Sequence, residues 1–280
     1  MKKYIKKATA ALGNIVPCKV RAVEVSSVSD SALLDGHLAL VTGGSSGIGF
    51  SIAQQLLSAG CRVVISGRDQ GRLNDAVRRL SSKDVRSISM DVTDPNDVND
   101  KVLAATTLFG EFACFDILVN SAGVWRGTRF PRTTQEDYDL VLDTNLKGTY
   151  FVSQAVAQLM IDRHVRGHIL NISSSSAMRP AWSPYQISKW GIKGLTLGMS
   201  DMLIKYGIVV NALAPGTTAT PMRGSEEGAE LTKPNSPCGR MADPREIGKL
   251  AVRMVSGEFD LVVGDTLYAT GGEGIIQLDR

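Results

Sequence analysis

The chain has 280 residues, 43% of them hydrophobic and 21% charged, with a formal net charge of +3. This length and composition are typical of one large globular domain, and no apolar run approaches the roughly 18 residues of a membrane span. Residues 1–35 hold six basic and three acidic residues, whereas the rest of the chain holds 25 of each. Residues 36–280 therefore carry no net charge, which argues against nucleic-acid binding, because such binding usually requires a broad basic surface.

The first 35 residues show no regular spacing of apolar residues and include Pro17 and a serine-rich stretch at 26–31. We expect a solvated basic extension with at most one short helix, and a membrane-surface anchor or a tether to a partner is the alternative. The lysines at 2–7 and the apolar stretch 8–16 suggest a signal peptide, but no small-x-small cleavage site follows. We therefore expect an uncleaved N-terminus.

The cysteines are widely spaced and have no histidine partners at metal-binding distance along the chain. They are Cys18, Cys61, Cys114 and Cys238. This usage predicts reduced thiols in a cytoplasmic protein that has no metal site.

From residue 36 onward, apolar runs of strand character alternate with helical patterns. The predicted strands are 37–42, 62–66, 85–90, 117–120, 168–172, 209–213 and 266–269. The predicted helices lie near 48–59, 70–81, 95–109, 135–164, 184–206 and 243–256. The alternation predicts one α/β domain over 36–280, a Rossmann-type doubly wound fold. Its sheet has about seven parallel strands, with helices on both faces.

A glycine-rich turn at 43–49 connects the first strand to the first helix. A turn of this kind presents backbone N–H groups and a helix N-terminus to a phosphate. The glycines at 43, 47 and 49 form a variant of the dinucleotide fingerprint. A P-loop is excluded because Phe50 stands where the phosphate-binding lysine must be, and an ordinary glycine-rich turn is the remaining alternative.

Polar or glycine-rich clusters follow six of the predicted strands, at the edge where doubly wound folds bind ligands. They lie at 43–49, 67–69, 91–92, 120–123, 173–176 and 215–216. Six such clusters in succession indicate a binding protein.

Tyr185 and Lys189 are four residues apart on a predicted helix and therefore share one face. A free tyrosine has a pKa near 10, which a nearby ammonium lowers. A phenol of lowered pKa can transfer protons near neutral pH, and a serine hydroxyl from 173–176 can hold the substrate oxygen. The alternative is a surface pair with no chemical role.

These motifs, in this order and at this spacing, resemble the short-chain dehydrogenase/reductase family over about residues 36–280. The resemblance rests on the segments 42–49, 120–123, 172–174 and 215–216 and on Asn145, Tyr185 and Lys189.

The resemblance implies a role for each of four residues. Tyr185 is the general acid in carbonyl reduction or the base in alcohol oxidation, and Lys189 binds the nicotinamide ribose and lowers the tyrosine pKa. Ser174 bonds the carbonyl oxygen, and Asn145 holds a water that connects Lys189 to solvent.

It also implies a dinucleotide site with the pyrophosphate on the glycine-rich turn, the adenine beside Asp91 and Val92, and the nicotinamide near Thr218 and Thr220. The implied cofactor-binding residues are Gly43, Ser45, Ser46, Gly47, Ile48, Gly49, Arg68, Asp91, Val92, Asn120, Ala122, Gly123, Tyr185, Lys189, Pro215, Gly216, Thr218 and Thr220.

Two positions depart from the family pattern. Ser121 replaces a second asparagine, a change that we expect to be tolerated. The interval from Ser174 to Tyr185 is about two residues shorter than is commonest, so Ser173 and Ser175 remain alternatives to Ser174.

The end of the second predicted strand bears on the choice of cofactor. NAD enzymes usually place an acidic residue there for the ribose 2′-OH, but this chain has Gly67 followed by Arg68. A guanidinium can bind a 2′-phosphate through two hydrogen bonds. We expect NADP(H), with NAD(H) as the alternative, although Ser46 lacks the basic side chain that many NADP-using relatives carry.

The substrate is weakly encoded. The aromatic and methionine side chains near the expected mouth of the substrate site suggest an apolar wall, and the arginines there either attract an anionic group or are merely exposed. These residues are Trp125, Arg126, Arg129, Met178, Arg179, Trp182, Met222 and Arg223. The segment 220–240 is placed where relatives have a mobile substrate lid.

We expect an oxidoreductase that acts on a small carbonyl compound or secondary alcohol. A 3-oxoacyl-thioester reductase is the main alternative. A dinucleotide-binding sensor or scaffold without turnover is disfavoured by the presence of Tyr185 and Lys189. Because relatives pair the helices at 135–164 and 184–206, we expect a homotetramer or a homodimer.

Overall fold

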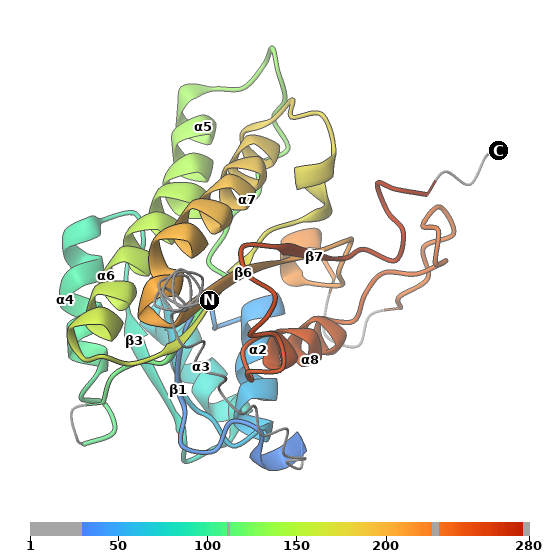
Figure 1. The fold of residues 1–280 in the computed structure, drawn as a ribbon. Coiled ribbons are helices and arrows are strands. Elements are labelled where there is room, and N and C mark those ends of the chain that lie inside the picture. Colours follow the sequence, from blue (N-terminus) through green and yellow to red (C-terminus); the bar gives the residue numbers. More distant parts are fainter. Residues whose placement is uncertain (1–29, 111–112, 226–229, 277–280) are drawn as a thin grey trace, which may run out of the picture.

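The computed structural model describes residues 30–110, 113–225 and 230–276 (Figure 1). Its centre is a seven-stranded, all-parallel sheet of order β3-β2-β1-β4-β5-β6-β7. The strands are β1 (Leu38–Thr42), β2 (Arg62–Gly67), β3 (Val85–Ser89), β4 (Ile117–Asn120), β5 (Gly167–Ile172), β6 (Ile208–Pro215) and β7 (Thr266–Ala269). The predicted doubly wound α/β fold is confirmed.

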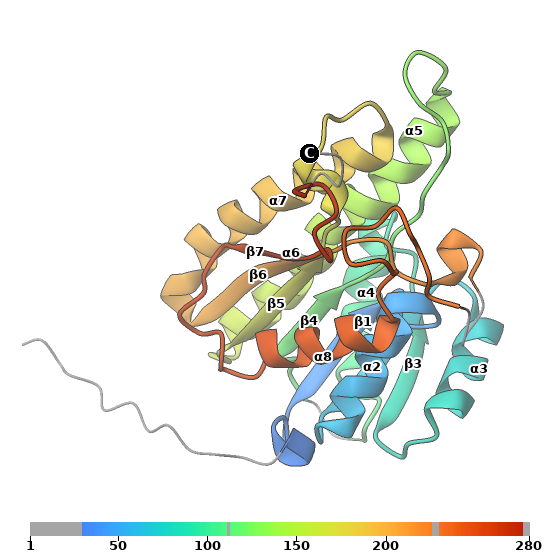
Figure 2. The same cartoon turned by 90° about the vertical axis from the view of Figure 1, so that its right-hand side faces the viewer.

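Helices cover both faces of the sheet (Figure 2). One hydrophobic cluster joins the sheet to α2 (Gly47–Ser58), α3 (Gln70–Leu80) and α8 (Pro244–Met254). The second cluster joins it to α4 (Pro95–Ala105), α6 (Gly148–Asp162) and α7 (Pro184–Leu203). The shorter α5 (Gln135–Leu142) leads into α6. Strands buried on both faces explain why their sequences are apolar throughout rather than alternating.

Local side-chain caps set where several helices begin. Asp69 accepts a hydrogen bond from the Arg72 N–H at the start of α3. Ser183 accepts from the Gln186 N–H, and Pro184 is the first residue of α7. These caps satisfy N–H groups that have no partner within the helix.

The strand order reverses at β1, which lies between β2 and β4. Thr42, the last residue of β1, is in register with Ser66 on one side and Asn120 on the other. After β1 the chain enters α2 on one face of the sheet, and after β4 it continues to α6 on the other face. Connections that diverge in this way open a crevice beyond the carboxyl ends of the strands. The fold thus places the predicted site at its topological switch point.

The helix predicted over 135–164 is interrupted by a π-helical turn, η3 (Asp143–Lys147). No glycine or proline within that turn announces the interruption, and the apolar spacing continues across it. Such turns are frequent at functional sites, and this one contains Asn145.

Residues 1–29, which hold most of the predicted basic extension, lie outside the described residues, so the boundary predicted after residue 35 stays a prediction. The described chain starts with a 3-10 turn, η2 (Asp30–Ala32). Leu34 is fully buried in the same hydrophobic cluster as α2 and α8, and its N–H donates to the Ala59 carbonyl at 2.8 Å. The segment directly before β1 therefore packs on the domain.

None of the helices in the described part of the chain is both long and apolar enough to cross a membrane. Cys61, Cys114 and Cys238 are free thiols, whereas Cys18 lies outside the described residues.

Candidate active site

The glycine-rich turn after β1 packs directly against the turn after β4. A Cβ on Gly43 would lie 2.8 Å from the Ala122 Cα, and a Cβ on Gly49 would lie 2.4 Å from the Gly43 carbonyl oxygen. Gly43 also has a φ of +66°, which disfavours other residues. Only glycine fits at these two positions, because a side chain would collide with the backbone of the turn itself or of the turn after β4.

Thr42 joins the two turns, although the sequence reading assigned it no role. Its hydroxyl oxygen accepts hydrogen bonds from the N–H groups of Ser121 and Ala122, both at 3.1 Å. The only sign of this role in the sequence is the position of the threonine, directly before the first glycine of the turn. Its hydroxyl holds the ends of β1 and β4 in register across the crevice.

The loop after β6 lies over the start of α2. A Cβ on Gly47 would lie 3.5 Å from the Thr220 side chain, which is buried. Thr218 is also buried, and its hydroxyl donates to the Gly216 carbonyl at 3.1 Å. The structure thus brings the glycine-rich turn and the two predicted threonines to one place.

Tyr185 and Lys189 lie on α7 with the ammonium 5.6 Å from the centre of the phenol ring. Lys189 is only 6% exposed, and its Nζ donates to the Ile172 carbonyl, the last of β5, at 2.8 Å. Burial lowers the pKa of Lys189 to about 8. The side chain is still mainly protonated at pH 7 and places a positive charge beside Tyr185.

The three candidate serines differ in where their hydroxyls lie. Ser173 is 3% exposed and donates to the Lys189 carbonyl at 3.3 Å, within the protein interior. Ser175 is also buried. Ser174 remains partly exposed, and its oxygen accepts from the Ser176 N–H at 3.1 Å. This arrangement favours Ser174 as the serine that contacts a substrate.

Asn145 clamps the loop after β4 to α7. Its Oδ1 accepts from the Val124 N–H at 2.8 Å, and its Nδ2 donates to the Val124 carbonyl at 3.0 Å and to the Ser188 hydroxyl at 3.2 Å. Ser188 donates in turn to the Tyr185 carbonyl at 2.7 Å. Ser188 was missed as a functional residue, although it lies within the Tyr185–Lys189 motif. The predicted water held by Asn145 stays a prediction.

The Asn120 side chain points into the protein interior. Its Nδ2 donates to Ser153 at 2.8 Å and to the Oδ1 of Asn171 at 2.9 Å. The amide of Asn171 donates to Thr196 at 3.0 Å. This buried chain of hydrogen bonds joins β4 and β5 to α6 and α7, so the Asn120 side chain supports the sheet. Its predicted contact with the cofactor stays a prediction.

At the other end of the crevice, β2 and β3 end beside the glycine-rich turn. A Cβ on Gly67 would lie 3.8 Å from the Ser45 hydroxyl. The Arg68 carbonyl accepts from the Ser89 hydroxyl at 3.1 Å, which ties this loop to β3. Asp91 accepts from the Thr93 N–H at 3.0 Å, and Val92 is buried. All of the predicted adenosine-side residues therefore lie along one edge of the sheet.

The expected substrate mouth combines exposed apolar side chains with a partly neutralised arginine. Trp125, Trp182 and Met222 are each nearly half exposed. Arg126 forms an ion pair with Asp137 at 3.4 Å, which weakens its attraction for an anionic substrate. The Arg223 side chain lies outside the described part of the structure.

The first anchor of the predicted lid is an ion pair between Lys233 and Glu273. Glu273 also accepts from the N–H and hydroxyl of Thr217, both at 2.9 Å. Burial raises the pKa of the Glu273 carboxyl, but the hydrogen bonds from Lys233 and Thr217 outweigh it and hold the pKa below its usual value. This partly buried pair was not predicted from the sequence.

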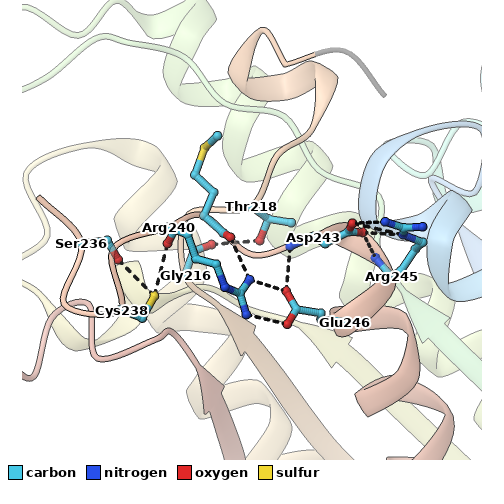
Figure 3. A network of polar contacts seen from close by, with 9 residues as sticks. Gly216, Thr218, Ser236, Cys238, Arg240, Asp243, Arg245 and Glu246 are labelled. Carbon is cyan, nitrogen blue, oxygen red and sulfur yellow. Dashed lines mark hydrogen bonds and ion pairs between the residues drawn. The ribbon is translucent and has the colours of Figure 1, made fainter. Parts of the chain in front are cut away.

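The second anchor lies where the lid meets α8 (Figure 3). Arg240 donates to both carboxylate oxygens of Glu246, each at 2.7 Å. Glu246 also accepts from the Asp243 N–H at 2.9 Å, which completes a capping box. Both anchors hold the C-terminal half of the predicted lid, whereas its first residues, Thr220 and Pro221, lie against Gly47 at the start of α2.

Comparisons with known proteins agree with this geometry. A sequence model described as short chain dehydrogenase matches residues 37–230. Gluconate 5-dehydrogenase of Gluconobacter oxydans is 36% identical over 247 residues, which are 85% of this chain and 95% of that protein. A 3-oxoacyl-acyl-carrier-protein reductase of Vibrio harveyi is 31% identical over 243 residues, covering 85% of this chain and 98% of that protein.

A solved structure shows the same likeness in three dimensions. It is a gluconate 5-dehydrogenase from Burkholderia cenocepacia in complex with NADP and tartrate. The sequence identity is 31% and the TM-score 0.77, and the match covers 87% of this chain and 97% of that one.

Proposed function

The chain belongs to the short-chain dehydrogenase/reductase family, and from that premise we propose that it is an NADP(H)-dependent oxidoreductase that interconverts a carbonyl compound and a secondary alcohol. The observation that carries the proposal is the buried Lys189 ammonium beside Tyr185. Lys189 also donates to the Ile172 carbonyl, two residues before the partly exposed Ser174. A nicotinamide cofactor bound here would supply the hydride to the carbonyl carbon or accept it from the alcohol. The chain itself handles the proton and orients the substrate.

In the reducing direction, the Tyr185 phenol donates its proton to the substrate oxygen. The phenolate that remains is stabilised by the Lys189 ammonium, and burial strengthens this attraction because little water screens it. The Ser174 hydroxyl holds the same oxygen by a hydrogen bond. In the oxidising direction, the phenolate accepts the proton from the alcohol.

The residues present fit a phosphorylated dinucleotide. The bare backbone at Gly43 and Gly49 would hold the pyrophosphate at the α2 N-terminus. Lys189 would bind the nicotinamide ribose. The absence of an acidic side chain at Gly67 and the guanidinium of Arg68 favour a 2′-phosphate, since a carboxylate would repel it.

We expect kcat/KM with NADPH to exceed that with NADH by at least about tenfold, the effect of one charge-assisted phosphate contact. Steady-state rates with each cofactor, at saturating concentration of the same carbonyl substrate, measure this ratio. Equal values for the two cofactors would refute the NADP(H) assignment.

The relatives point to two substrate classes, sugar acids and 3-oxoacyl thioesters, and both reactions use the same proton chemistry. Assays with D-gluconate and NADP⁺, a 3-oxoacyl thioester and NADPH, and simple ketones and NADPH separate them. Turnover of any of these supports an oxidoreductase. Cofactor binding with no turnover across the panel would favour the alternative of a dinucleotide-binding sensor.

We also propose that α7 packs against a second copy of the chain. Its outer face exposes Ile187, Trp190 and Leu197, and a Cβ on Gly194 or Gly198 would meet nothing within 4 Å. Glycine in an exposed helix costs about 1 kcal/mol relative to alanine, a cost that close approach of another backbone would offset. The predicted homotetramer or homodimer would use this face.

Light scattering coupled to gel filtration should therefore give at least twice the monomer mass. Leu197→Glu, at a position 62% exposed in the single chain, should shift the protein toward monomers. Leu103→Glu is the matched control, because Leu103 is 55% exposed on α4. A monomeric wild-type protein would rule the α7 contact out.

A further inference from the structure

One guanidinium reaches the glycine-rich turn from outside it. Arg72, near the start of α3, donates from its Nη2 to the Ser46 hydroxyl at 3.4 Å. The Arg72 backbone is fixed because its N–H donates to Asp69, the N-cap of α3, at 3.0 Å. The side chain therefore spans from the first turn of α3 to the N-cap of α2.

Arg72 differs from Arg78, on the same helix, and from Arg240 in its partner. Arg78 on the same helix pairs with Asp75, and Arg240 pairs with Glu246. Within the described ranges, Arg72 forms no ion pair with a carboxylate, and its recorded side-chain partner is a neutral hydroxyl. The two nearest acidic residues in sequence are both engaged, Asp69 as the helix cap and Asp75 with Arg78. Arg72 thus keeps a positive charge at this corner of the crevice.

Ser46 is unusual for a residue that begins a helix. It occupies the N-cap position of α2, yet its side chain makes no capping hydrogen bond to that helix. Its hydroxyl oxygen accepts from Arg72, which leaves the hydroxyl hydrogen free to be donated. A guanidinium and a hydroxyl donor therefore stand side by side, one residue along the chain from Ser45, whose hydroxyl lies 3.8 Å from a Cβ placed on Gly67.

We propose that Arg72 is a specificity-determining residue that binds the 2′-phosphate of NADP(H) together with Ser46 and Arg68. The inference rests on the proposed function, because it assigns residues to the phosphate that distinguishes NADP(H) from NAD(H). A guanidinium has five N–H donors, so one bond to Ser46 leaves others for phosphate oxygens. Arg72 thereby supplies, from α3, the charge that Ser46 does not carry.

Arg72→Gln tests this assignment, because glutamine keeps helix propensity and removes the charge. Calorimetric titration should show NADP⁺ and 2′,5′-ADP binding about tenfold more weakly than to wild type, with NAD⁺ affinity changed less than about twofold. Arg72→Lys should recover part of the loss. Arg78→Gln, a charge removal on the same helix, should leave all three affinities unchanged.

The outcomes separate this inference from the proposed function. If wild type prefers NADP⁺ and Arg72→Gln keeps that preference, the Arg72 assignment is wrong and the NADP(H) assignment stands. If Arg72→Gln lowers the melting temperature and weakens the affinities for NADP⁺ and NAD⁺ equally, Arg72 has only a structural role. That result would also overturn the assignment. A wild-type protein that binds NAD⁺ at least as tightly as NADP⁺ would overturn both.

Discussion

Tyr185→Phe is expected to lower kcat by about 10³-fold, within the range of about 10²–10⁴ that a general acid or base contributes. Phenylalanine keeps the ring that packs beside Lys189 but removes the oxygen that carries the proton. Without it, the substrate oxygen must take its proton from water, and no phenolate forms for the Lys189 ammonium to stabilise. The loss should appear in kcat rather than in cofactor affinity.

Stopped-flow or steady-state NADPH oxidation gives kcat, and a fluorescence titration gives the Kd for NADPH, which should stay within about threefold. Tyr206→Phe is the matched control, because Tyr206 is an exposed tyrosine beyond the far end of α7. Turnover by Tyr185→Phe at the wild-type rate would contradict the proposed chemistry. Equal losses in both variants would indicate a general effect on the fold.

Gly49→Ala is expected to destabilise the protein by about 1–3 kcal/mol and to weaken NADPH binding by about 10–100-fold. The new methyl group would lie 2.4 Å from the Gly43 carbonyl oxygen and 2.9 Å from its carbon, both of them backbone atoms. The turn has to move because neither atom can rotate away as a side chain would. The N–H groups that we propose to bind the pyrophosphate move with it.

Chemical denaturation and NADPH titration measure the two effects separately. Gly127→Ala is the matched control, because Gly127 lies in an exposed loop and its Cβ would meet the Trp125 ring at an ordinary 3.5 Å. The control should change stability by less than about 0.5 kcal/mol. If Gly49→Ala has the stability and the NADPH affinity of wild type, the turn can shift to accommodate the methyl group, and the prediction is wrong.

Most of the fold could be predicted from the sequence because its signals are local. Parallel strands buried on both faces are short apolar runs, and each predicted strand lies within two residues of the observed one at either end. The α3 cap at Asp69 and the shared face of Tyr185 and Lys189 follow from helix geometry alone. The glycine spacing predicted the turn between β1 and α2 for the same reason.

What the sequence could not decide depends on residues that are distant along the chain. The π-helical turn at Asn145 breaks a helical pattern without a local signal, and the choice of Ser174 rests on Ser173 being turned toward the Lys189 carbonyl.

The Arg72–Ser46 bond and the Lys233–Glu273 pair join elements separated by 26 and 40 residues. The sequence by itself therefore determined the elements, their order and the motifs, since these follow from backbone periodicity and turn chemistry. Only the tertiary structure decided which side chains meet across the crevice, because packing, not spacing, sets those distances.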